Sequence, residues 1–202
     1  MNLGQRFARF TTDVVVRRPA LWRLFGGLTR AYFDRLAPRW DTMRSPAGLA
    51  AFELALDAVQ PPRRMLDLGT GTGSAALVLA RRFPEAEIVG VDLSPRMIDE
   101  ARRKAPPELA HRVRFEVGDA ERLPYENGSF DLVALANAIP FFDELARLVA
   151  PGGAALFSAS LGARTPIYVP RERLEPELRS RGFAEFAEFS APPASALLAR
   201  KR

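Results

Sequence analysis

Glycines and an acid are spaced in this chain so that they could hold a charged ligand. Residues 63–73 read Arg-Arg-Met-Leu-Asp-Leu-Gly-Thr-Gly-Thr-Gly, an apolar run that leads into Gly69, Gly71 and Gly73. Glycine has no Cβ and adopts positive φ readily, so the backbone N–H groups can approach a ligand. A helix-forming segment starts at Ser74, and a helix N-terminus favours an anionic group such as a carboxylate or phosphate. The stretch predicts a binding loop between a strand and a helix.

Asp67 stands two residues before the first of these glycines. A carboxylate buried there without a partner is costly, so we expect it to accept hydrogen bonds from local N–H groups or to face a cationic ligand. The glycines alone do not identify the ligand, because Gly71, Gly73 and Ala76 also fit the dinucleotide fingerprint. A Walker loop is excluded, since no Gly-Lys-Ser/Thr follows.

Asp92 and Asp119 end the next two predicted strands. Asp92 lies nineteen residues beyond the last glycine of the loop, where an acid can accept hydrogen bonds from both ribose hydroxyls; alternatively, Asp92 or Ser94 caps the helix that follows. With Asp67, three neighbouring strands end in a carboxylate, and such groups repel one another unless a polyhydroxylated or cationic ligand lies among them. Asn137 adds a polar residue at the end of the fourth strand.

The elements that must position these residues are predicted from alternating apolar runs and helical segments. The predicted strands are Met65–Leu68, Glu87–Val91, Val113–Val117, Phe130–Ala136, Ala154–Ser160, Phe183–Phe189 and Ser195–Ala199. Strand–helix alternation gives a parallel sheet with right-handed crossovers, in which ligands bind outside the carboxyl ends of the strands. Pro192-Pro193 leaves a short loop between the last two strands, which predicts a hairpin. The expected fold is α/β: a Rossmann-like, doubly wound, seven-stranded, mostly parallel sheet with an antiparallel C-terminal hairpin, plus N-terminal helices.

Residues 1–45 differ from the rest of the chain and are expected to form an N-terminal helical cap segment. Their apolar residues recur at helical spacing, which predicts two or three helices, and they carry nine Arg against three Asp. We favour a solvated helical face over nucleic-acid binding, and peripheral contact of this Arg-rich segment with an anionic membrane stays open. Pro46–Val59 is predicted as the helix that precedes the sheet.

Length and composition exclude several kinds of site. The chain has 202 residues, enough for one domain with a full core. It contains no Cys and a single His, His111, so disulfides, thiolate metal sites and histidine metal clusters are excluded and no metal is expected. No apolar run approaches the length of a transmembrane segment, and the N-terminus lacks a secretory apolar region before its first arginines. We therefore expect a cytoplasmic protein.

Three motifs carry a resemblance to a known family. Asp67-x-Gly69-x-Gly71-x-Gly73 resembles motif I of the class I S-adenosylmethionine-dependent methyltransferases, and residues 91–101, Val-Asp-Leu-Ser-Pro-x-Met-Ile-x-x-Ala, resemble motif II. Residues 32–41, Tyr-Phe-Asp-Arg-Leu-Ala-Pro-Arg-Trp-Asp, resemble the pattern that precedes motif I in small-molecule methyltransferases of the ubiquinone/menaquinone biosynthesis type. The resemblance implies the class I fold for residues 46–202, with S-adenosyl-L-methionine as the cofactor and S-adenosyl-L-homocysteine as its product.

The resemblance also implies roles for individual residues. Asp92 would bind the ribose and Leu93 and Met97 would flank the adenine, while Asp119 would accept the adenine amino group. The backbone of Ala120 would meet the ring, and that of Asn137 the methionyl amine. The implied cofactor-binding set is Asp67, Gly69, Thr70, Gly71, Gly73, Asp92, Leu93, Met97, Asp119, Ala120 and Asn137.

An acceptor pocket is expected beside the cofactor. Tyr32 and Trp40 lie in the segment that covers the cofactor in the family, with Trp40 at a position where the pattern has Tyr. Phe141 follows the fourth strand and faces either the acceptor or the core, and Tyr168 follows the fifth strand, where substrate loops of the fold often lie. No catalytic residue can be named, and none is required, because a sulfonium methyl group is already activated and the protein mainly aligns the reactants and excludes water.

The expected function is therefore methylation of oxygen, nitrogen or carbon in a small-molecule acceptor by in-line displacement. Two alternatives stay open: an RNA methyltransferase, because of the basic N-terminal segment, and a non-catalytic S-adenosylmethionine-binding module, because no catalytic residue is identified. Methylation of DNA adenine is not expected, since Asn137-Ala-Ile-Pro departs from the Asn/Asp-Pro-Pro-Tyr/Phe pattern of those enzymes. The Asp67 motif also argues against nicotinamide-dependent oxidoreduction.

Overall fold

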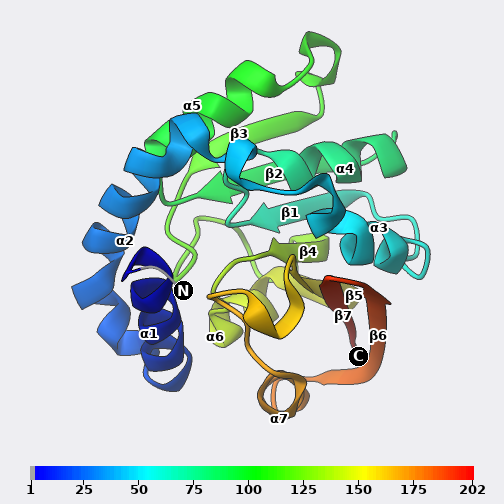
Figure 1. Cartoon of the computed structure of the whole chain (residues 1–202). Helices are drawn as coiled ribbons and strands as arrows, with labels where there is room; N and C mark the ends of the chain where they lie inside the picture. The colour runs from blue at the N-terminus through cyan, green and yellow to red at the C-terminus, as the bar shows by residue number, and fades with distance from the viewer. Residues whose placement is uncertain (1–2) are drawn as a thin grey trace.

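The computed structural model describes residues 3–202 and contains a seven-stranded sheet (Figure 1). The strands are β1 (Arg64–Leu68), β2 (Glu87–Asp92), β3 (Val113–Val117), β4 (Phe130–Ala136), β5 (Val149–Ala159), β6 (Phe183–Ala191) and β7 (Ala194–Lys201). Their order is β3-β2-β1-β4-β5-β7-β6. Strands β1 to β5 pair in parallel, whereas β7 runs antiparallel to both β5 and β6. The predicted fold class, with its C-terminal hairpin, is confirmed.

The helices lie before, between and after these strands. The α-helices are α1 (Leu3–Arg17), α2 (Trp22–Leu36), α3 (Ala50–Leu56), α4 (Ser74–Arg82), α5 (Pro95–Lys104), α6 (Phe142–Leu148) and α7 (Arg171–Arg179). Short 3₁₀ helices are η1 (Pro19–Leu21), η2 (Ala37–Arg39), η3 (Asp41–Met43), η4 (Pro46–Leu49), η5 (Pro107–Leu109) and η6 (Gly162–Arg164).

Two predicted elements differ from the structure by more than two residues at an end. Residues 46–59, predicted as one helix, divide into η4, which starts with a three-residue bond from the Gly48 N–H to the Ser45 carbonyl, and a shorter α3. Helix α3 ends at Leu56 because the N–H groups of Ala58 and Val59 bond three residues back in turns. Strand β5 begins at Val149 and not at Ala154. Val149 pairs with Phe130 ahead of a register shift, so the intervening Pro-Gly-Gly forms an irregular part of the strand and not the loop that its composition suggests.

Two apolar layers enclose the sheet. Met65 and Leu132 point to the layer formed with α3, α4 and α5, whereas their neighbours Leu66 and Val133 point to the layer formed with α6 and α7. All four side chains are fully buried. Burial on both faces explains why β1 and β4 have nearly continuous apolar sequences. The same packing holds the carboxyl ends of these strands, where Asp67 and Asn137 lie, in position.

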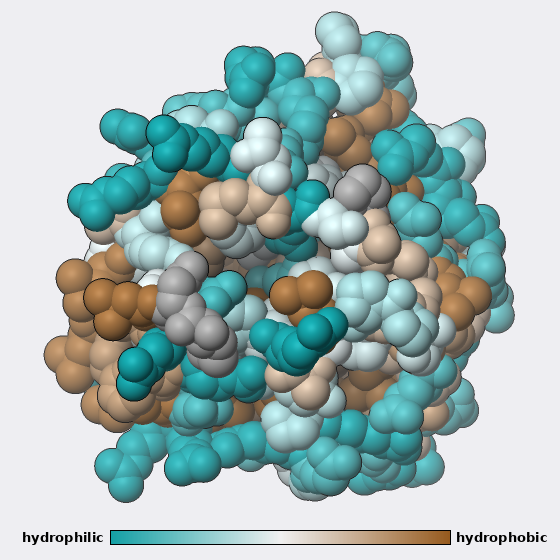
Figure 2. Space-filling view, viewed as in Figure 1, coloured by the Kyte–Doolittle hydropathy of each residue, from teal (hydrophilic) through white to brown (hydrophobic). Residues whose placement is uncertain are grey.

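The N-terminal helices stand beside the carboxyl ends of the central strands. In Figure 1, α1 and α2 (blue) lie at the side toward which β1 and β2 point. Apolar surface is visible over these helices in Figure 2, and their exposed apolar residues are Leu3, Phe10, Leu24 and Leu28. Across residues 3–202, none of the helices has the length and apolarity that crossing a membrane would require.

Candidate functional site

The glycine loop joins β1 to α4 in a conformation that only glycine adopts easily. Gly69, Gly71 and Gly73 have φ values of 74°, 55° and 79°, in the left-handed region that side chains with a Cβ avoid. Space is also limiting, since a Cβ on Gly69 would lie 2.6 Å from the Cβ of Ala138. The positive φ values expected from the sequence are therefore present, and the loop ends where α4 begins at Ser74.

Asp67 is fully buried beneath this loop. Its Oδ2 accepts a hydrogen bond of 2.6 Å from the Thr70 hydroxyl and one of 3.0 Å from the Ala76 N–H. Its Oδ1 is buried and has no hydrogen-bond partner among residues 3–202. Burial raises the pKa of Asp67 to about 6, although the bonds from Thr70 and Ala76 act in the opposite direction. The carboxylate thus has local donors on one oxygen and unused acceptor capacity on the other.

Asp92 connects the end of β2 to the glycine loop. Its Oδ2 accepts a 2.8 Å hydrogen bond from the Gly71 N–H, and its Oδ1 accepts a 2.9 Å bond from the Ser94 N–H. Burial raises the pKa of Asp92, opposed by these two bonds. The helix cap is Ser94, whose hydroxyl accepts from the Met97 N–H at 3.1 Å. Because each carboxylate oxygen can accept more than one hydrogen bond, Asp92 retains capacity for ligand hydroxyls.

Asp119, after β3, binds a residue that the sequence analysis did not identify. The Trp22 indole Nε1 lies 2.8 Å and 2.9 Å from the two carboxylate oxygens of Asp119, and the Glu121 N–H donates to Oδ1 at 3.0 Å. Trp22 is 5% exposed and meets Phe141 edge to face, with ring centroids 5.3 Å apart. No motif marked Trp22, because it lies 97 residues from its partner.

Asn137 has an unusual backbone conformation at the end of β4. Its φ is 59°, which is uncommon for a residue with a Cβ and is often found at ligand sites. Its side-chain oxygen accepts a 2.9 Å hydrogen bond from the Ser160 N–H, and its own N–H donates to the Ser158 carbonyl at 2.9 Å. Both contacts fasten the end of β4 to the end of β5.

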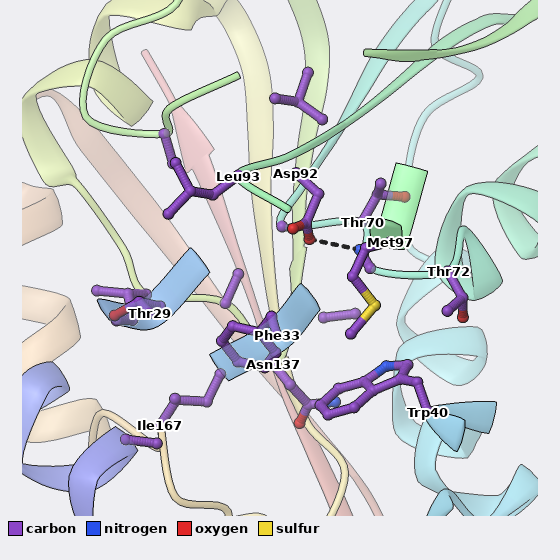
Figure 3. A pocket seen from close by; sticks show the side chains of 18 of the residues that line it. Thr29, Phe33, Trp40, Thr70, Thr72, Asp92, Leu93, Met97, Asn137 and Ile167 are labelled. Atoms are coloured by element: carbon purple, nitrogen blue, oxygen red, sulfur yellow. Dashed lines mark hydrogen bonds between the residues drawn. The ribbon is translucent and has the colours of Figure 1, made fainter. Parts of the chain in front are cut away.

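These strand ends surround a cavity of about 130 Å³ (Figure 3). Asp92, Leu93 and Met97 contribute to its wall beyond β2, and Trp40 lies across from them. The predicted site residues that line this cavity are Tyr32, Trp40, Gly69, Thr70, Gly71, Asp92, Leu93, Met97, Ala120, Asn137 and Phe141. Asp67, Gly73 and Asp119 support the walls from behind, and Tyr168 lines a different cavity.

A protein-family model matches the part of the chain that contains the glycine loop and the strand-end acids. Residues 65–153, which include the glycine loop and all three acids, match the family model described as a methyltransferase domain. These residues form a methyltransferase domain. The match confirms the resemblance to S-adenosylmethionine-dependent methyltransferases that the motifs predicted.

Alignments with two curated relatives are longer than the match to the family model. The chain is 40% identical over 136 residues to demethylmenaquinone methyltransferase of Thermus thermophilus, covering 60% of each protein. It is 39% identical over 147 residues to malonyl-[acyl-carrier protein] O-methyltransferase of Halorhodospira halophila, covering 67% of this chain and 48% of that protein. In these alignments the chain spans about half to three fifths of its relatives' length.

A solved structure shares the fold of the methyltransferase domain. Haemonchus contortus phosphoethanolamine N-methyltransferase 2, in complex with S-adenosyl-L-methionine, superposes with a TM-score of 0.61 at 21% identity. The match covers 76% of this chain and 52% of that one. Together with the strand order, it shows the class I methyltransferase fold.

A second, larger cavity lies next to the first at the same edge of the methyltransferase domain. Its volume is about 490 Å³, and it shares Asn137, Ala138 and Ile167 with the first cavity. Tyr168 lines it, and burial, with help from two nearby glutamates, raises the pKa of the Tyr168 hydroxyl. Ser158 also lines it with a buried hydroxyl that has no partner within the described part of the chain.

Hydrogen bonds attach the N-terminal helices to loops at the carboxyl edge of the sheet. The Arg9 guanidinium donates to the carbonyls of Ala163, Thr165 and Tyr168 at 2.8 to 3.1 Å. On α2, Asp34 accepts a 2.6 Å bond from the Ser94 hydroxyl. These contacts attach both helices to loops that border the two cavities.

The short helix η3 attaches the same segment to the glycine loop. Asp41 accepts a 2.5 Å bond from the Thr72 hydroxyl and a 3.0 Å bond from Lys104. Burial acts to raise the pKa of Asp41, but these hydrogen bonds lower it overall. Next to η3, Arg44 lines the first cavity and lies 5.2 Å from the centroid of the Trp40 ring.

Proposed function

We propose that the chain binds S-adenosyl-L-methionine in the first cavity and transfers its methyl group to a small-molecule acceptor. The observation that carries the proposal is the contact between the Gly71 N–H and the Asp92 carboxylate. It joins a loop with glycine at alternate positions to an acid at the next strand end, on the wall of one cavity. A hydroxylated, partly cationic ligand suits that combination of N–H donors and carboxylates.

The residues around the first cavity fit the chemistry of this cofactor. Asp92 has acceptor capacity for ribose hydroxyls, and Leu93 and Met97 offer apolar sides for a flat ring. Asp67 has a buried oxygen without a partner among the described residues, which favours positive charge nearby. Arg44 supplies a cation suited to the carboxylate of a methionine moiety. Burial lowers the pKa of Arg44, and the charges of Asp41 and Asp67 oppose that effect.

When bound, the cofactor supplies a methyl group that is already activated on a sulfonium. The chain's own residues therefore need to align the acceptor and exclude water. Tyr32, Phe33 and Trp40 form edge-to-face ring contacts beside the first cavity, with centroids 5.4 Å and 5.5 Å apart. Such an aromatic wall excludes water without adding charge.

The second cavity is the proposed place of the acceptor. Its walls are largely apolar, and Asn137, Ala138 and Ile167 line both cavities, so the two cavities adjoin. The Tyr168 hydroxyl, like that of any tyrosine, is protonated at neutral pH, and burial raises its pKa further, so it can donate a hydrogen bond to a polar group of the acceptor. The expected acceptor is thus a mainly apolar small molecule with a polar group near the atom that is methylated.

The names of similar proteins support a small acceptor. The relatives are named for a demethylmenaquinone and for the malonyl group of an acyl-carrier protein, and the solved neighbour for phosphoethanolamine. Their acceptors differ, so the choice of acceptor is carried by residues outside the shared glycine loop. The second cavity is where such differences would act.

Calorimetry with S-adenosyl-L-methionine and S-adenosyl-L-homocysteine tests donor binding. We expect both to bind, and Arg44→Gln to weaken binding about tenfold, the effect of losing one charge-assisted hydrogen bond. The matched control is Arg39→Gln, which changes an exposed arginine of the same segment and should leave the affinity unchanged. Absence of heat with either ligand on folded wild-type protein contradicts the proposal.

Product formation separates an enzyme from a binding module. With a panel of quinols, acyl thioesters and amino alcohols, mass spectrometry should detect S-adenosyl-L-homocysteine that increases with the acceptor concentration. Donor binding without turnover on any acceptor would support a non-catalytic role. Turnover on RNA alone would instead favour the basic N-terminal segment as an acceptor-binding surface.

A further inference from the structure

Beside Asp119, at one side of the first cavity, lies an apolar slot that the Trp22 ring already occupies. Trp22 forms a buried cluster with Val15 and Phe141, and Leu93 and Ala120 pack against that cluster. The Asp119 carboxylate closes the slot and accepts the indole N–H on both oxygens. A slot with apolar sides and a carboxylate at its end suits a planar heterocycle that donates N–H bonds.

Adenine is such a heterocycle, and Leu93, Ala120 and Asp119 are the residues that the motifs assign to it. An indole and a purine are both flat, fused two-ring systems with an N–H donor at one edge. The two rings cannot occupy the slot together, because the indole is 5% exposed within it. The remaining cavity, about 130 Å³, is also below the roughly 300–1,000 Å³ of typical ligand pockets.

We propose that Trp22 is a built-in competitor of the donor: its indole fills the adenine slot, and the donor binds only when the start of α2 moves off Asp119. The inference rests on the proposed function, since it assumes that an adenosyl ligand uses this site. The structure described here is then the closed form. A closed form that excludes the ligand lowers its apparent affinity in proportion to the fraction of molecules that are closed.

The surroundings of Trp22 allow this movement. Trp22 is the first residue of α2, directly after the short helix η1, so it can turn outward without unfolding the sheet. Gly26 and Gly27 follow one turn later, and glycine weakens a helix by about 1 kcal/mol relative to alanine. The anchors of Arg9 on α1 and Asp34 near the end of α2 lie on either side, so the segment can remain attached while its middle part moves.

Removing the indole should strengthen donor binding. We expect Trp22→Ala to bind S-adenosyl-L-homocysteine at least fivefold more tightly than wild type in calorimetry, because the competing closed form is lost. Trp22→Phe retains a buried ring, so it guards against loss of folding. Because phenylalanine has no N–H donor for Asp119, this variant should bind S-adenosyl-L-homocysteine more tightly than wild type does, but less tightly than Trp22→Ala. Leu24→Ala, at an exposed position of the same helix, is the matched control and should not change the affinity.

Unchanged or weaker binding in both Trp22 variants, with a wild type that binds, overturns this inference and leaves the proposed function intact. A wild type and variants that all fail to bind overturn the proposed function, and the inference falls with it. Near-ultraviolet circular dichroism of each variant establishes that the fold is retained.

Fluorescence reports the movement directly, because the chain has two tryptophans and Trp40→Phe leaves Trp22 as the reporter. S-adenosyl-L-homocysteine should shift Trp22 emission from that of a buried indole toward that of an indole in water. Calorimetry on the same Trp40→Phe protein establishes binding under those conditions. Binding without any shift of the Trp22 emission contradicts the displacement of the indole.

Discussion

At the scale of single residues, the buried carboxylate of Asp67 lowers the folding stability of the protein at neutral pH. One oxygen has two donors and the other is buried without a partner in residues 3–202. Burial raises its pKa to about 6 from the ordinary aspartate value of 3.8. Between these two values the folded protein binds more protons at Asp67 than the unfolded chain does, so its contribution to stability is present at low pH and is lost as pH rises.

Replacing this acid by its amide should therefore change the pH dependence of stability. For wild type without ligand, the Asp67 contribution should decrease from about pH 4 to about pH 6 and then stay constant. In Asp67→Asn this decrease is absent, so the variant should gain stability relative to wild type as pH rises. Urea unfolding midpoints at several pH values measure it. Asp99→Asn, with an exposed side chain, is the control, and an unchanged pH profile in Asp67→Asn would show that the buried acid does not titrate as described.

At the scale of elements, the N-terminal helices depend on few long-range bonds. Arg9 connects α1 to three carbonyls of the segment from η6 to Tyr168. That segment contributes Ile167 to both cavities. A charged donor shared by three backbone acceptors therefore couples the position of α1 to the shape of the proposed acceptor cavity.

Loss of this connection should loosen two segments at once. In Arg9→Ala, amide hydrogen exchange should become faster in both α1 and residues 162–169, while β1 and β4 stay protected. Arg6→Ala, an exposed position on the same helix, should change neither segment. The global free energy of unfolding should fall by about 1.5–3 kcal/mol, the range for hydrogen bonds to a charged group. Faster exchange confined to α1 would mean that Arg9 does not couple the two segments.

At the scale of the whole molecule, the strand order brings the site together. Because β2 and β4 both flank β1, the glycine loop lies between Asp92 on one side and Asn137 on the other. The loop, the acids and both cavities share the carboxyl edge of one sheet. A ligand at this edge contacts several strand ends at once, so it should stabilise the whole fold and not only one loop.

Thermal unfolding measures that coupling. S-adenosyl-L-homocysteine at about 100 times its Kd should stabilise the fold by about 2.7 kcal/mol, which raises Tm by about 5–10 °C for a domain of this size. NAD at the same concentration should leave Tm unchanged, since the motifs do not favour a dinucleotide. A rise with NAD that equals the rise with S-adenosyl-L-homocysteine would contradict the choice of cofactor.

The sequence by itself determined the features that depend on local order along the chain. Alternating apolar runs predicted the strands, and the glycines at 69, 71 and 73 predicted the positive φ values of the loop. The acids at 67, 92 and 119 were predicted at strand ends because periodicity shows where strands stop. All these features depend on residues that are close together in the sequence, so the spacing of residue types is enough to predict them.

Only the tertiary structure decided which distant side chains meet. Trp22 donates to Asp119 across 97 residues, and Ser94 donates to Asp34 across 60. No spacing rule encodes such pairs, because they arise when α2 packs over the carboxyl edge of the sheet. The same packing separates Tyr168 from Tyr32 and Trp40 into two cavities, and it places the Trp22 indole against the Asp119 carboxylate.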